Sequence, residues 1–129
     1  MHELNIETQK KEQLIDITTE VSKVVAEWGI DHGICAIFIP HTTAAVTINE
    51  NADPDVKHDI LLGLNSIAKN DFRYKHAEGN SVAHIKSTLV GASISIPVKE
   101  RKIALGQWQG IYFCEFDGPR KRTIRIQVR

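Results

Sequence analysis

The sequence predicts an α+β fold with a mainly antiparallel β-sandwich core and about three helices. Strand-like segments, in which apolar and polar residues alternate, stand at both ends of the chain, and helix-like segments lie between them. This order favours α+β over alternating βαβ units. The strand-rich C-terminal half favours antiparallel sheets folded over as a sandwich. A length of 129 residues suits one domain, which we expect to span residues 1–129.

The N-terminal segment predicts two strands and a helix. HELNIETQ, which begins at His2, alternates apolar and polar residues, and LIDIT, which begins at Leu14, can form a second strand. From Ile17 the apolar residues take helical spacing, and Gly29 marks the end of this helix. The face expected to be buried consists of Ile17, Val21, Val24, Val25 and Trp28.

Two strands follow, joined by a bend at the sequence H-T-T. GICAIFIP, residues 33–40, is short and apolar on both faces, which predicts a central strand covered on both sides. AAVTINE, residues 44–50, is a second buried strand, and alternation places Glu50 on its apolar face with Ala44, Val46 and Ile48.

The longest helix is predicted from Pro54 to about Lys69. Asp53 is a good N-cap residue, and the missing N–H of Pro54 costs nothing at the first helical position. The inward stripe is expected at Val56, Ile60, Leu64 and Ile67.

After a turn-rich loop, the sequence SVAHIKSTLV predicts a short helix. Asn80 or Ser81 caps it, and Gly91 ends it. Its inward stripe is expected at Val82, Ile85 and Leu89.

The remainder of the chain predicts only strands. ASISIPV alternates cleanly, and residues 102–118 form one long strand or two, broken near Gly106 or Gly110. After a D-G-P-R turn, TIRIQVR closes the chain with its apolar residues inward.

Charge and composition exclude several classes of partner. Lys plus Arg and Asp plus Glu both number 16, so no global field recruits nucleic acid or an anionic membrane. Without a long apolar run or a signal-peptide pattern, we expect a cytoplasmic protein with no membrane partner. Cys35 and Cys114 lie in apolar strands and are expected to be small buried hydrophobic residues. The C-terminal arginines form either a polyanion surface or a solvated strand face; without interleaved aromatic residues, we expect no nucleic-acid partner.

Three histidines are candidate ligands or catalytic groups. His41 lies at the H-T-T bend, His76 lies in the loop, and His84 lies on the short helix. Neutral imidazoles suit zinc and similar ions, and a three-histidine site leaves a position open for water or substrate. The alternative is that each histidine is a hydrogen-bonded residue at the surface or its boundary.

Carboxylates and amides form a second set of candidates. Asn49, Glu50, Asp53 and Asp55 can bind a hard cation or act in acid–base chemistry, although capping already explains Asp53. Glu50 and Glu115 both share a strand face with apolar residues. A carboxylate in such a place needs a partner or has a raised pKa. Arg120 or Arg122 can supply the partner of Glu115.

Three blocks of the sequence resemble the YjbQ family, whose members often carry the name secondary thiamine-phosphate synthase enzyme. The blocks are PHTTAAVTINENADPDV, YKHAEGNSVAHIKSTLVGAS and LGQWQGIYFCEFDGPRKR, and the resemblance covers nearly the whole chain from about Ile17. It implies a small α+β fold with a β-sandwich core, assembled as a homotrimer with sites at or near subunit interfaces. It also implies one polar cluster, made of His41, His76 and His84 with Asn49, Glu50, Asp53, Asn80, Lys86, Gln109 and Glu115 nearby.

The family name implies a reaction that joins hydroxymethylpyrimidine diphosphate to a thiazole phosphate and releases diphosphate. Such chemistry ordinarily uses a divalent ion and cationic side chains on the leaving group. In this chain Asp53 or Glu50 can hold magnesium, and Lys86 or Arg120 can neutralise phosphate oxygens. We therefore expect a trimeric enzyme with Glu50, Asp53, His84, Lys86 and Glu115 as catalytic candidates and Asn49, Asn80, Gln109 and Arg120 as substrate-binding candidates. The alternative is a trimer that binds a metal or small ligand without turnover.

Overall fold

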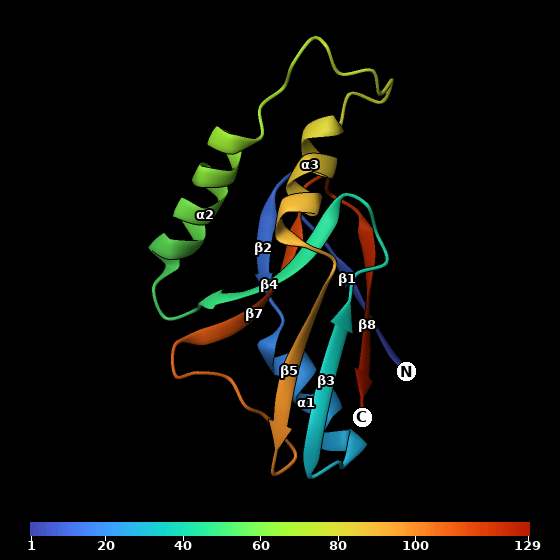
Figure 1. The fold of residues 1–129 in the computed structure, drawn as a ribbon, viewed down its shortest axis with the longest axis vertical. Helices are drawn as coiled ribbons and strands as arrows, with labels where there is room; N and C mark the ends of the chain where they lie inside the picture. The colour runs from blue at the N-terminus through green and yellow to red at the C-terminus, as the bar shows by residue number, and fades with distance from the viewer.

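The computed structural model describes residues 1–129 and contains three helices and eight strands in two antiparallel sheets (Figure 1). The five-stranded sheet has the order β1-β8-β3-β5-β6, and the three-stranded sheet has the order β2-β7-β4. The strands are β1 (His2–Glu7), β2 (Gln13–Asp16), β3 (His32–Phe38), β4 (Ala44–Glu50), β5 (Ser93–Lys99), β6 (Lys102–Ile103), β7 (Gln109–Glu115) and β8 (Lys121–Val128). The helices are α1 (Thr18–Trp28), α2 (Pro54–Ile67) and α3 (Ser81–Val90). The predicted α+β class is confirmed.

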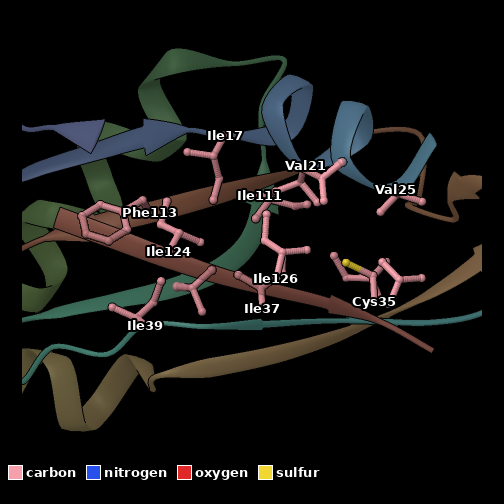
Figure 2. Close-up of a cluster of buried hydrophobic side chains, with 14 of the residues drawn as sticks. Ile17, Val21, Val25, Cys35, Ile37, Ile39, Ile111, Phe113, Ile124 and Ile126 are labelled. Carbon is pink, nitrogen blue, oxygen red and sulfur yellow. The ribbon is translucent and has the colours of Figure 1, made fainter. Parts of the chain in front are cut away.

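The main core lies between the two sheets and α1. Figure 2 shows Val21 and Val25 of α1 pointing toward the strands, where they meet Cys35 of β3, Ile111 of β7 and Ile126 of β8. These side chains are all fully buried. Because apolar burial contributes about 25 cal/mol for each Å² removed from water, this cluster is the principal source of stability.

A smaller apolar cluster lies on the other face of the three-stranded sheet, beneath α2 and α3. Tyr112 and Cys114 of β7 face this cluster, whereas Ile111 and Phe113 face the main core. Ala83 of α3 packs into the smaller cluster. The strand β7 is therefore covered on both sides, and side chains at its end are shielded from water.

Local signals set the end of α1 and the start of α2 as predicted, whereas the Asn80 side chain, at the N-cap of α3, makes no capping hydrogen bond. Gly29 ends α1 with a left-handed φ of 74°, which costs glycine little. Asp53 precedes α2, and its carboxylate accepts a hydrogen bond from the Asp55 N–H at 2.9 Å. The predicted break in the long C-terminal segment falls between β6 and β7, and Gly106 lies in it.

The predicted inward stripes of α2 and α3 are partly wrong. Ile67 of α2 is 71% exposed, and no residue of α2 is fully buried. On α3, Leu89 is 55% exposed, and the buried residues are Ala83, Lys86 and Ser87. The physical reason is close approach: α3 packs on β4, whose outward residue there is Ala45, so small side chains occupy the contact.

Both cysteines are free and buried, as predicted. Burial raises the pKa of Cys35 to about 11 and that of Cys114 to about 12, so both remain thiols at neutral pH. None of the three helices is long and apolar enough to cross a membrane.

Candidate functional site

The β3–β4 connection, the N-terminal end of α3 and the start of β8 lie at the same end of the molecule (Figure 1). Residues of these segments line a cavity of about 380 Å³. We call it the His cavity, because its lining includes His41, His76 and His84. The other polar groups at its edge are Thr42, Thr43, Glu78, Asn80, Arg120 and Arg122. An adjoining hollow of about 390 Å³ shares His41, Thr42 and His84 and continues along α3. The fold thus brings the three predicted histidines from three separate segments to one place.

The histidines differ in their surroundings. His76 and His84 stand edge to face, with ring centroids 5.3 Å apart. His41 Nε2 accepts a hydrogen bond from the Thr123 N–H at 2.9 Å, which places the ring proton of the neutral form on Nδ1. Burial and the nearby Arg122 charge lower the pKa of His41, so its imidazole is neutral at pH 7.

The same histidines do not form a ready set of metal ligands. No group of three or more His, Cys, Asp and Glu side chains is arranged to hold a metal ion. His41 Nε2 is engaged by the backbone, and Glu78 is the only carboxylate on the cavity lining. A magnesium ion prefers several oxygen ligands, which this lining does not supply. Zinc-like binding by the histidines stays a prediction.

A buried ion pair supports the floor of the cavity. Arg122 donates from Nε to Glu115 at 2.8 Å and from Nη2 to the other carboxylate oxygen at 2.5 Å. Its Nη2 also donates to Thr43 Oγ1 at 2.8 Å. The inward carboxylate of Glu115 therefore has the arginine partner that the sequence predicted, and Arg122 is that partner.

Glu115 is charged in spite of its burial. Burial alone would raise its pKa, but hydrogen bonds from Arg122, Thr8 and the Asp117 N–H bring the pKa below its ordinary value. The pair holds the guanidinium in one place, and Nη1 of Arg122 makes no hydrogen bond to protein, so it remains available to a ligand.

Asp117 organises the neighbouring wall. Its carboxylate accepts hydrogen bonds from Asn80 Nδ2 and Arg120 Nη2, both at 2.9 Å, and also pairs with Lys11. Burial opposes its charge, but these partners lower the pKa of Asp117 to about 2. Asn80 and Arg120 are thereby fixed at the edge of the His cavity, while Asn80 Oδ1 is buried without a partner.

Several predicted site residues lie elsewhere. Asn49, Glu50 and Asp53 lie at or just beyond the far end of β4, a strand of seven residues that spans about 20 Å at ~3.3 Å per residue. Gln109 pairs with Glu50 at that end. One oxygen of Glu50 is buried without a partner. Within one chain these four residues form a second polar group, separate from the His cavity.

Lys86 also lies apart from the histidines, on the other face of α3. Its ammonium donates to Glu12 at 2.7 Å and to Asn65 at 2.6 Å, and it lies 6.0 Å from the centroid of the Phe116 ring. It lines a different cavity, which does not include His84. His84 and Lys86 are two positions apart on α3, and two positions correspond to a rotation of about 200° around the helix axis.

Sequence reasoning did not select Thr8, Thr43 or Asp117. Thr43 is part of the H-T-T bend, and its hydroxyl close to His41 in the sequence could have indicated a site residue. Asp117 belongs to the predicted D-G-P-R turn, and an aspartate before a glycine usually indicates a turn rather than a site residue. Thr8 lies far away in sequence and gave no signal.

Comparisons with known proteins agree on one family. A family model described as UPF0047 protein YjbQ-like matches residues 2–129. The chain is 50% identical to the UPF0047 protein MJ1081 of Methanocaldococcus jannaschii over 95% of its own length and 89% of that protein. It is 51% identical to the UPF0047 protein YugU of Bacillus subtilis, covering 97% of this chain and 96% of that protein.

Solved structures are similar over their whole length. A crystal structure of an uncharacterised YjbQ/UPF0047 protein from Clostridium acetobutylicum superposes with a TM-score of 0.97 at 50% identity, covering 100% of both chains. A YbjQ-like protein of unknown function from Sulfolobus solfataricus has a TM-score of 0.93 at 35% identity, covering 98% of this chain and 94% of that one.

Proposed function

The chain belongs to the YjbQ-like UPF0047 family, and we propose that it is an enzyme that acts on a phosphorylated small molecule in the His cavity. One observation carries the proposal: three separate segments place imidazole, guanidinium and amide groups on a single cavity. A cavity of about 380 Å³ suits a small substrate.

Anion recognition rests on donors that the protein holds in place. Arg122 is fixed by Glu115, which leaves Nη1 to bind a phosphate oxygen. Neutral His41 presents its Nδ1–H as a further donor. Donors fixed before the reaction stabilise developing negative charge at no cost of reorganisation. Arg120, half-exposed at the rim, adds a second positive charge.

His84 is the acid–base group in this proposal. Its ring makes no hydrogen bond within the chain and lines both adjoining hollows, so it is free to meet a substrate. An imidazole exchanges protons readily between pH 5 and 8. In a synthase-type reaction, a thiazole nitrogen attacks the methylene carbon of the pyrimidine, and the C–O bond to diphosphate breaks. His84 then donates a proton to the departing diphosphate, and Arg122 neutralises its charge.

Turnover of the two thiamine precursors tests the assignment of His84. We expect His84→Ala to lower kcat/KM by about 100-fold or more, the usual contribution of a general acid. His58→Ala is the matched control, because His58 is exposed on α2 and pairs only with Asp59. Equal turnover in the wild type and in His84→Ala would remove His84 from the mechanism.

The second candidate is a protein that binds a ligand or metal without turnover. The observation that favours it is the edge-to-face pair of His76 and His84, which can hold a ligand without chemistry. It predicts saturable binding while both precursors stay unchanged. Metal content measured on untagged protein, in the wild type and in His84→Ala, tests the metal-binding form of this candidate.

A further inference from the structure

A second cavity, of about 370 Å³, lies on the other face of α3 from the His cavity. We call it the Lys86 cavity; the residues that matter here are Lys11, Lys69, Asn80, Val82, Lys86 and Phe116. We propose that the Lys86 cavity binds a phosphate group, either as free phosphate or as the head of a phosphate ester. The two cavities share only Asn80, and the phosphate proposal does not depend on the function proposed for the His cavity.

The buried ammonium of Lys86 is the first argument. Its side chain is only 3% exposed, and a lysine is almost never buried this far without a partner. An ammonium has three N–H donors, and two of them are used by Glu12 and Asn65. The third makes no hydrogen bond to protein, although Lys86 lines the cavity.

The charge of the lining is the second argument. Three lysines and one carboxylate, Glu12, border the cavity. Lys11 forms an ion pair with Asp117, and Lys86 forms an ion pair with Glu12. Lys69 makes no ion pair, so the surroundings keep an excess positive charge even when Asp117 is counted.

The start of α3 is the third argument. Asn80 occupies the N-cap position, but its side chain makes no capping hydrogen bond and instead donates to Asp117. The N–H groups of Ser81 and Val82 therefore have no intrahelical acceptor, and the positive end of the helix dipole is uncapped. Gly79, Asn80 and Val82 line the cavity, and Asn80 Oδ1 is buried without a partner.

Together these groups match a phosphate better than a carboxylate or a halide. A phosphate offers several oxygen acceptors, which suit backbone N–H groups and a lysine at once. Asn80 Oδ1 can accept a hydrogen bond from a protonated phosphate oxygen. The ring of Phe116 and the side chains of Val82 and Ala83 line the rest of the cavity and leave apolar room for an ester substituent.

The test is a titration of the full chain with inorganic phosphate at constant ionic strength, followed by backbone amide NMR. We expect saturable shifts at Gly79, Ser81 and Val82. Lys69→Ala should weaken binding about threefold, as for an exposed charge. The double variant Lys86→Met with Glu12→Gln, which removes the buried pair without leaving a lone charge, should weaken it at least about tenfold.

Two control variants make the test decisive. Lys23→Ala removes an exposed lysine on α1, and His84→Ala changes only the His cavity; both should bind phosphate as the wild type does. The proposal is overturned if no saturable shifts occur, if Lys23→Ala weakens binding as much as Lys69→Ala, or if His84→Ala abolishes binding. Because Lys69 is exposed, its variant should fold even if the double variant does not. Tighter binding of glycerol phosphate than of phosphate would assign the site to an ester; equal binding would assign it to the free ion.

Discussion

At the scale of single residues, the site rests on charges that are buried but paired. Glu115 is fully buried, yet Arg122, Thr8 and a backbone N–H satisfy its oxygens. The need for a basic partner was predictable, because the alternation of β7 places Glu115 among inward residues. The choice of Arg122 over Arg120 was not, since it depends on the paths of β7 and β8 in space.

The pH dependence of stability tests the role of Asp117. Its pKa is about 2 in the folded chain and about 3.9 in an unfolded one, so the charged form stabilises the fold. This contribution is fully present above about pH 4 and is lost as pH falls toward 2. We expect Asp117→Asn to lower the free energy of unfolding at pH 7 by about 2 kcal/mol.

Urea unfolding between pH 3 and pH 7 measures this contribution. The difference in the free energy of unfolding between the wild type and Asp117→Asn should become smaller as pH falls below about 4. Asp59→Asn, at an exposed position, should stay within about 0.5 kcal/mol of the wild type throughout. If this difference in the free energy of unfolding stayed constant from pH 3 to pH 7, packing rather than charge would explain how Asp117 stabilises the fold.

At the scale of elements, α3 separates two chemical environments. His84 faces the His cavity, and Lys86 faces the Lys86 cavity. The sequence predicts the helix, and the resemblance to the YjbQ family implies one cluster that contains both residues. Which face of α3 is buried depends on the contact with β4, where Ala45 lets the helix approach closely. The spacing of hydrophobic residues therefore predicts the buried face of α1 correctly and the buried face of α3 incorrectly.

The turn between β7 and β8 positions Asp117 and Arg120, and Gly118 makes that turn possible. A Cβ at Gly118 would lie 2.3 Å from the backbone oxygen of Lys10, which cannot move freely. We expect Gly118→Ala to lower the free energy of unfolding by about 2 kcal/mol or more. Thermal unfolding of the purified variants measures the effect.

Gly63→Ala is the matched control for Gly118→Ala. Gly63 lies within α2, and nothing lies within 4 Å of an added Cβ. Alanine there should raise stability by about 1 kcal/mol, because it favours the helix. If both variants lost equal stability, close packing at the turn would not explain Gly118.

At the scale of the whole molecule, the fold divides residues that the sequence places together. The segment from His41 to Asp53 looks like one polar corner, but an extended β4 separates its two ends. Alternation predicts the strand, and its length alone implies the separation. The cap at Asp53 and the gathering of three histidines were both predictable. At the second polar end, where Glu50 pairs with Gln109, one carboxylate oxygen of Glu50 has no hydrogen-bond partner within one chain.

A homotrimer is the assembly that we propose, and exposed apolar residues support an interface. Ile34 is 56% exposed and Phe38 is 45% exposed on the outer face of β3. Arg125, paired with Phe38 across the sheet, has a buried Nε without a partner. Light scattering should give three times the mass of one chain, and Ile34→Glu should reduce it. The control is Phe72→Glu, at a fully exposed loop position. A monomeric wild type, or a trimer unchanged by Ile34→Glu, would contradict this interface.

The central claim is that the His cavity, which His41, His76 and His84 line, is the substrate site, and imidazole NMR tests it most directly. A titration with thiazole phosphate should move the ¹⁵N signals of these three side chains together, with a single dissociation constant. His58, on the exposed face of α2, should not respond. If the signal of His84 stayed fixed while the ligand bound, or if His58 moved equally, the His cavity would not be the substrate site.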